Sequence, residues 1–249
     1  MIFRQLFEST SSTYTYLLGC EETRQAVLID PVLPTWQRDL EAVGALGLRL
    51  ACTVETHVHA DHITSALRLK REAGSRIVYP ASDAFACADD LIEEGKPLEV
   101  GGISLEGIHT PGHTDDHFSY RIGDRVFTGD ALLIDGCGRT DFQNGDATTL
   151  YASVHEKLFT LPEDTLVYPA HDYKGRRVST VGQEKARNPR LGGGRDLQTF
   201  LGIMQALDLP YPKFIDYAVP GNRQCGVCPD GIPDSLQQYC ESIEVSLQG

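Results

Sequence analysis

Alternating apolar and polar positions predict several strands in the first quarter of the chain. This alternation places one face of a strand on a core, and β-branched and aromatic residues are enriched in the same segments. Between two of the strands, residues 34–46 open with Pro34 and carry apolar residues at helical spacing, which predicts a helix. The predicted strands are 2–7, 13–18, 26–29 and 48–54.

The remaining chain mixes hairpins with helices. Helices are predicted at 63–73, where Gly74 stops the helix, at 146–159 with Asp146 as its N-terminal cap, and at 181–187 and 195–207. From about residue 210 a short Pro- and Gly-rich C-terminal extension follows. Strands mixed with helices in both halves predict one α/β domain over 1–249, an αββα sandwich of two sheets with helices outside. The further predicted strands are 76–79, 98–100, 103–109, 118–122, 126–128 and 165–168.

Composition narrows the class of protein. The 249 residues are 41% apolar and 23% charged, and 22 basic against 35 acidic residues give a net charge of −13. This acidic balance argues against nucleic acid as a partner, and no apolar run reaches the ~20 residues of a membrane span. The first residues show no basic segment before an apolar one, so no signal peptide is expected. We therefore expect a cytoplasmic enzyme without a membrane partner.

The seven cysteines are odd in number and scattered along the chain. In a chain of this length, that distribution predicts reduced thiols and a reducing compartment rather than a disulfide scaffold. Cys225 and Cys228 form a CxxC pair, but no second pair or nearby His pair completes a zinc site. We expect a loop with two free thiols there, in preference to a redox switch.

Three of the eight histidines fall within six residues, in His57-x-His59-x-Asp61-His62. The motif follows a predicted strand, and residues two apart on an extended segment point the same way. Imidazole and carboxylate groups together suit zinc, iron or manganese. Histidines that are only solvated or structurally bonded are the alternative, but the density of the motif favours a metal site.

Three further candidates, His113, Asp130 and His171, each follow a predicted strand. Loops at the ends of strands gather on one edge of a sheet, so these groups are expected beside the quartet. The spacing alone suggests a binuclear metal site. His109 and His117 have no such setting, and His155 on a helix face is expected to be structural.

These seven residues resemble the signature of the metallo-β-lactamase superfamily, which implies the αββα sandwich with a metal at one edge. Within it, the chain resembles the persulfide dioxygenase family more than the hydroxyacylglutathione hydrolases (glyoxalase II). The segments that carry this resemblance follow the Gly136-Cys137-Gly138-Arg139 stretch found in both families, and they extend to about Cys225. They are Thr140-Asp-Phe-Gln-Asn-Gly145, Tyr168-Pro-Ala-His-Asp-Tyr-Lys-Gly175, Asn188-Pro-Arg-Leu191 and Asp216-Tyr-Ala-Val-Pro220.

The resemblance implies that His57, His113 and Asp130 hold one Fe(II) per chain. His59, Asp61, His62 and His171 would then orient the ligands and bond to bound water. The implied reaction oxidises the sulfane sulfur of glutathione persulfide with O2 and water to sulfite and glutathione. A binuclear hydroxyacylglutathione hydrolase is the alternative. A non-catalytic persulfide sensor is the third possibility, and the full set of ligand-type residues speaks against it.

Glutathione carries two carboxylates, so its site needs cations. Residues 173–195 contain seven basic residues and one acidic residue, beside His171. Arg139 can grip a carboxylate with two parallel hydrogen bonds. We expect Arg139, Tyr173, Lys174 and Arg176 to bind substrate, in that order. A homodimer and a separate sulfurtransferase of the rhodanese type are further expected partners from the resemblance.

Overall fold

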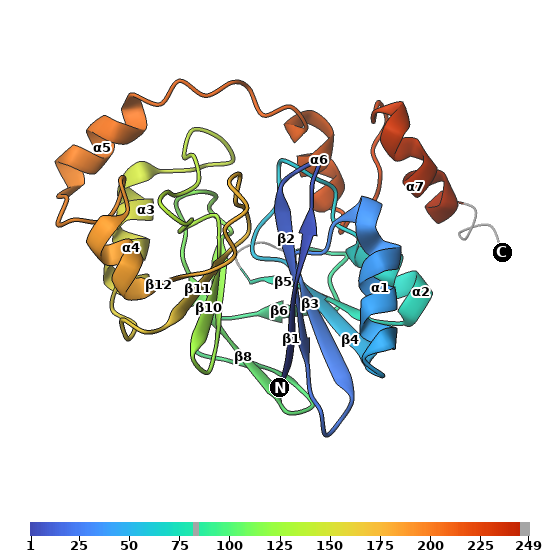
Figure 1. The fold of residues 1–249 in the computed structure, drawn as a ribbon. Coiled ribbons are helices and arrows are strands. Elements are labelled where there is room, and N and C mark those ends of the chain that lie inside the picture. Colours follow the sequence, from blue (N-terminus) through green and yellow to red (C-terminus); the bar gives the residue numbers. More distant parts are fainter. Residues whose placement is uncertain (82–84, 245–249) are drawn as a thin grey trace.

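Two mixed β-sheets pack face to face, with helices on their outer faces, in the computed structural model, which describes residues 1–81 and 85–244 (Figure 1). This arrangement confirms the predicted αββα sandwich. The first sheet contains, in spatial order, β1 (Ile2–Glu8), β2 (Thr13–Gly19), β3 (Gln25–Ile29), β4 (Arg49–Val54), β5 (Arg76–Pro80) and β6 (Asp90–Ile92). The second contains β12 (Ser179–Thr180), β11 (Leu166–Pro169), β10 (Arg125–Gly129), β9 (Phe118–Ile122), β8 (Ile103–His109) and β7 (Leu98–Val100).

The helices cover both outer faces of the sandwich (Figure 1). α1 (Trp36–Ala45) and α2 (Ala66–Ala73) lie on the first sheet, and α3 (Ala147–Ser153), α4 (Val181–Arg187) and α5 (Leu197–Gln205) lie on the second. A 3-10 turn η1 (Leu33–Thr35) precedes α1, and a π-helical turn η2 (Val154–Leu158) extends α3. α6 (Ile215–Asn222) and α7 (Asp234–Glu244) follow the long connection after α5.

The alternation of β2 divides its side chains between two cores. Tyr16 and Leu18 face the core between the sheets, whereas Leu17 faces the core under α1 and α2. Aromatic rings fill the layer between the sheets, where Tyr16 and Phe127 have ring centroids 4.8 Å apart. Because the side chains of a strand alternate between its two faces, the alternation of β2 decides which of its residues meet the second sheet.

Several boundaries differ from the prediction for local reasons. Asp146 caps α3 as predicted, since its Oδ1 accepts a hydrogen bond from Thr149 N at 2.7 Å. The helix predicted from residue 63 begins only at Ala66, because Ser65 N donates to Pro31 O and the chain first pairs with the segment after β3. β6, β12, α6 and α7 lie in segments for which no element was predicted.

The prediction of seven reduced thiols is wrong for four of them. Cys87 is bonded to Cys225, and Cys228 is bonded to Cys240 in α7. The two cysteines of the CxxC pair therefore face different parts of the chain rather than each other. The free thiols, all buried, are those of Cys20, Cys52 and Cys137.

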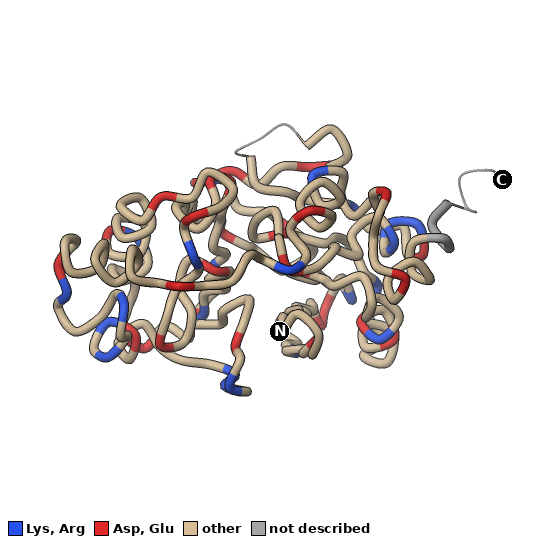
Figure 2. Tube along the Cα trace, turned by 90° about the horizontal axis from the view of Figure 1, so that it is seen from above, with Lys and Arg blue, Asp and Glu red and all other residues tan. Residues whose placement is uncertain are grey.

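Basic and acidic residues are interspersed over the described molecule. Lys and Arg positions are mixed with Asp and Glu positions when the molecule is seen from above (Figure 2). Within the described part of the chain, none of the helices combines the length and the apolar character that crossing a bilayer requires.

Candidate metal centre

The candidate ligands lie at one edge of the sandwich because the strands that precede them run in the same direction. β3, β4 and β5 pair in parallel, so the segments after β3 and β4 leave the first sheet together. β10 and β11 are also parallel, and β8 shares their direction because β8 and β10 both pair antiparallel with β9. Tyr14 N donates to Ala170 O at 2.7 Å and ties the two sheets together at this edge.

His57, His113 and Asp130 converge in space. Each offers one potential ligand atom, and these atoms all lie within 4.8 Å of one another. His113 Nε2 is 3.5 Å from Asp130 Oδ2, and the ring centroids of His57 and His113 are 4.9 Å apart. His57 is buried, whereas His113 and Asp130 are half-buried. Two imidazoles and one carboxylate form a donor set that transition metals accept.

Hydrogen bonds to the second ring nitrogen orient both histidines. His113 Nδ1 lies 2.6 Å from Arg139 O, so Nδ1 carries the proton and donates it to the carbonyl. His57 Nδ1 lies 2.9 Å from Thr56 Oγ1. Burial and the neighbouring His59 hold the pKa of His57 well below its usual range, which keeps the imidazole neutral. A neutral ring with one nitrogen fixed presents the other nitrogen to a metal.

A second group of predicted residues surrounds the carboxylate of Asp61. Asp61 Oδ2 lies 3.0 Å from His62 Nδ1 and 3.5 Å from His171 Nε2, and it accepts a hydrogen bond from Thr13 Oγ1 at 3.2 Å. Burial would raise the pKa of Asp61, but His171 and His62 outweigh burial and hold the pKa well below its usual range. Because His171 Nε2 is also 3.7 Å from Asp130 Oδ1, this group adjoins the first one.

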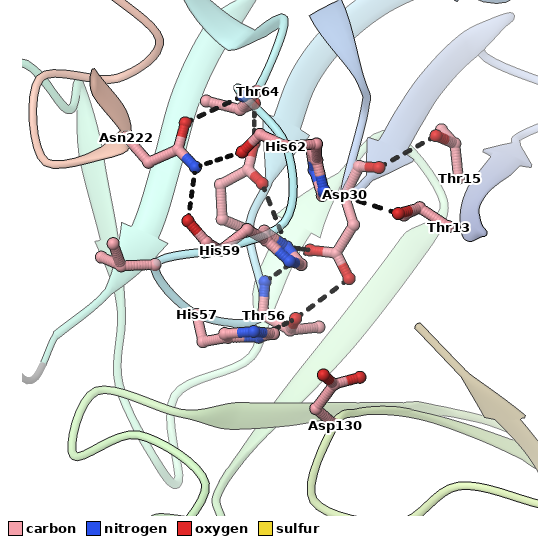
Figure 3. Close-up of polar contacts among 12 residues, drawn as sticks. Thr13, Thr15, Asp30, Thr56, His57, His59, His62, Thr64, Asp130 and Asn222 are labelled. Atoms are coloured by element: carbon pink, nitrogen blue, oxygen red, sulfur yellow. Dashed lines mark hydrogen bonds and ion pairs between the residues drawn. The ribbon is translucent and has the colours of Figure 1, made fainter. Parts of the chain in front are cut away.

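His59 turns toward two acidic residues that the sequence analysis missed. Its Nε2 lies 3.1 Å from Asp30 Oδ1 and 3.8 Å from Glu55 Oε2, and all three residues are buried (Figure 3 shows His59 and Asp30). Asp30 also accepts hydrogen bonds from Thr56 N at 2.7 Å and Thr56 Oγ1 at 3.0 Å. Burial raises the pKa of Glu55 to about 8. The sequence feature that could have identified Asp30 is its position directly after the predicted strand 26–29.

His117 belongs to the site, so its exclusion in the sequence analysis is wrong. Its Nε2 accepts a hydrogen bond from Asp130 N at 3.0 Å, its Nδ1 contacts Thr110 Oγ1 at 2.9 Å, and its ring stacks on His57. Gly129 makes this approach possible: it has φ +51°, and an added Cβ would lie 2.4 Å from His117 Nε2. His155 instead stacks on Tyr151 and is structural, as predicted.

The donor set fits a metal ion. Asp130 Oδ1 and His62 Nε2 are buried, and neither forms a hydrogen bond with any part of the chain that the structure describes. Buried polar atoms without partners are rare in proteins and usually mark an ion, a water or a function. The unpaired atoms at this edge, next to the three converging residues, therefore support a metal site.

A cavity of about 740 Å³ opens beside these groups. His113, Asp130, Asp61 and His171 reach its wall, and so do apolar residues of the connection between α5 and α6. A cavity of this size can hold a small peptide-like ligand. The four predicted substrate-binding residues, Arg139, Tyr173, Lys174 and Arg176, all line it.

The two arginines on this wall already have protein partners. Arg139 pairs with Asp141 through Nε and Nη2 at 2.6 and 2.7 Å, and its Nη1 donates to Pro210 O at 2.8 Å. Arg176 bonds to Asp172 and Asp135. Their predicted role in substrate binding stays a prediction, and these contacts show that both arginines also shape the wall.

Comparisons with known proteins agree with the geometry. Residues 10–171 match the model of the "Metallo-beta-lactamase superfamily". Persulfide dioxygenase ETHE1, mitochondrial, of Bos taurus is 52% identical over 91% of this chain and 89% of its own. The crystal structure of ETHE1 from Myxococcus xanthus has a TM-score of 0.88 and 55% identity, covering 91% of this chain and 100% of that chain.

A "Probable hydroxyacylglutathione hydrolase" of Schizosaccharomyces pombe is less similar, at 34% identity over 70% of this chain and 69% of its own. These similarities confirm the predicted family over the hydrolase alternative. The chain belongs to the persulfide dioxygenase family of the metallo-β-lactamase superfamily.

Proposed function

We propose that the protein is an Fe(II)-dependent dioxygenase that oxidises the sulfane sulfur of glutathione persulfide with O2 and water to sulfite and glutathione. The observation that carries this proposal is the convergence of His57, His113 and Asp130 beside the cavity, whose wall His113 and Asp130 reach. Relatives named persulfide dioxygenase share half of the residues of this chain, which supports the same reaction here.

His57, His113 and Asp130 would hold the Fe(II), one per chain. A bound Fe(II) with only three protein ligands supplies open positions where a persulfide and O2 can be brought together. The protein prepares this site by fixing the orientation of the His113 ring through Arg139 O and the backbone of Asp130 through His117. Asp61, His62 and His171 would orient water and ligands around the ion.

The carboxylates of glutathione would bind on the cavity wall formed by residues 173–176. The Lys174 ammonium forms no ion pair within the described parts of the chain, and the Tyr173 ring lies over His171 with 75% of the residue exposed. These two groups are free to meet a substrate anion. Arg139 and Arg176 would add charge from positions already held by Asp141 and Asp172.

We further propose a cytoplasmic location, a separate rhodanese-type sulfurtransferase as the source of the persulfide, and a homodimer. These rest on the sequence analysis, and the Bos taurus relative is itself named mitochondrial. Disulfides are uncommon in a reducing compartment. A count of free thiols in the protein therefore also tests the proposed cytoplasmic location.

Substitution of the proposed ligands tests the function. His113→Ala and Asp130→Ala should each lose iron and oxygen uptake together, because each removes one of three ligands. Metal analysis and an oxygen electrode measure the two effects. A variant that keeps oxygen uptake with persulfide while depleted of iron would contradict the ligand assignment.

A further inference from the structure

The side chain of Asn222 lies against the backbone of the segment that carries the histidine quartet. Its Nδ2 donates hydrogen bonds to His59 O at 2.9 Å and to His62 O at 2.7 Å, and its Oδ1 accepts one from Thr64 N at 2.9 Å (Figure 3). The residue is 1% exposed. One side chain, about 160 residues away in sequence, thus satisfies three backbone groups of residues 59–64.

These three groups lie outside the regular elements, between the end of β4 and the start of α2. Backbone carbonyls and N–H groups in such a buried segment need partners from side chains or water. The carbonyls of His59 and His62 both point at this one amide, so the chain turns between them. The amide of Asn222 therefore selects one conformation of residues 59–64.

The backbone that carries Asn222 is itself anchored. Asn222 O accepts a hydrogen bond from Tyr79 OH in β5 at 3.0 Å. Cys225 is bonded to Cys87, and its carbonyl accepts a hydrogen bond from Leu67 N at 3.1 Å. Gly226, at φ +97°, passes so close to the quartet segment that an added Cβ would lie 2.4 Å from Thr64 O.

The two halves of the quartet segment have different supports. The first half is held from within the sandwich, where Asp30 accepts from Thr56 N and Asp116 accepts from Val58 N. The second half is held by Asn222 at the end of α6, and its Ile63 O also accepts a hydrogen bond from Leu33 N at 2.9 Å. The ring of His59, in this second half, contacts the ring of His57, with their centroids 4.1 Å apart. A shift of residues 59–64 would therefore also displace His57, the proposed metal ligand.

We propose that Asn222 is a positioning residue of the metal centre: it fixes residues 59–64 from the C-terminal region and so holds His57 and its neighbours in the arrangement that binds the metal. This inference rests on the proposed metal-dependent function. Asn222 touches neither the ligand atoms nor the cavity wall, and it acts through the backbone of His59, His62 and Thr64.

The test is a metal titration of the whole metal-free chain. Co(II) binding is monitored by visible absorption, and Fe(II) binding is measured under anaerobic conditions. Asn222→Asp keeps the acceptor for Thr64 N and removes both donors. We expect it to weaken metal affinity about 10- to 100-fold, the range seen when partners behind metal ligands are lost, and to change the Co(II) spectrum. Val43→Ala, in the core under α1, is the control: it should lower thermal stability and leave affinity and spectrum unchanged.

Wild-type affinity and spectrum in Asn222→Asp would overturn the inference, as would a loss of affinity in Val43→Ala that matches its loss of stability. If Asn222→Asp does not fold, Tyr79→Phe decides, because it removes only the hydroxyl that anchors Asn222. Its affinity should fall relative to Tyr151→Phe, whose hydroxyl donates to Arg195 O in another part of the molecule, and equal affinities would overturn the inference. A wild-type protein that binds no metal would instead contradict the proposed function itself.

Discussion

The histidines at the candidate metal centre differ in what their ring nitrogens contact. His113 uses Nδ1 to donate to Arg139 O, whereas His117 uses Nε2 to accept from Asp130 N. The same type of side chain is therefore a proposed ligand in one case and supports a proposed ligand in the other. His113 was predicted from the sequence whereas His117 was left out, because the contact of His117 with Asp130 N exists only in the folded chain.

Replacement of His117 by Phe keeps a ring of similar size and removes the acceptor for Asp130 N. Metal affinity should fall about 10- to 100-fold, because Asp130 loses the contact that fixes its backbone. Isothermal titration with Fe(II) under anaerobic conditions measures the change. His155→Phe is the matched control, since His155 bonds to Leu191 O among the helices outside the second sheet. Equal metal affinities in the two variants would refute the role of His117.

Lys174 offers a direct probe of substrate binding. Lys174→Ala should raise KM for glutathione persulfide about threefold to tenfold, because one charge-assisted hydrogen bond to a carboxylate is lost. kcat and iron content should stay unchanged. Lys185→Ala, which removes an exposed lysine of α4, should leave KM at the wild-type value. An unchanged KM in Lys174→Ala would remove Lys174 from the site.

At the scale of elements, the sequence predicted helices and strands well where the apolar residues of a segment followed one clear period. The alternation in 13–18 corresponds to β2, whose inward Tyr16 and outward Leu17 face separate cores. β6 and β12 are only three and two residues long, too short for a pattern to be seen. α6 contains Pro220, which disfavours a helix locally, and its packing on the first half of the chain stabilises it.

The pairing of cysteines could not be predicted, because it depends on which segments meet in space. The Cys87–Cys225 bond attaches the C-terminal region and closes a loop with a sequence separation of 138, whereas Cys228–Cys240, with a separation of 12, lies within that region. Loss of a bond that closes a long loop lowers stability by ~2–5 kcal/mol.

Thiol titration of the denatured protein tests this pairing. Without reductant we expect three reactive thiols, from Cys20, Cys52 and Cys137, and with reductant all seven. The double variant Cys87→Ser/Cys225→Ser should unfold at lower denaturant concentration than Cys228→Ser/Cys240→Ser, since it opens the longer loop. Seven thiols without reductant would show that both bonds are absent in the isolated protein.

At the scale of the whole molecule, the sequence predicted the ligand-type residues, and the structure shows which other residues hold them in place. His57, His113 and Asp130 were among seven candidates found because strands that end at one edge of the sandwich bring their loops together, and the family resemblance singled out these three. Their supports come from remote positions such as Asp30 and Asn222. A side chain that bonds to a backbone group far away in the sequence leaves no local motif, so these contacts appear only in the folded chain.

The most direct test is metal content measured alongside oxygen uptake and sulfite release, on anaerobically purified protein given glutathione persulfide. A three-residue ligand set predicts about one iron per chain, with oxygen consumed and sulfite formed. About two zinc ions or mixed metals per chain, no oxygen uptake and hydrolysis of a glutathione thioester would contradict it.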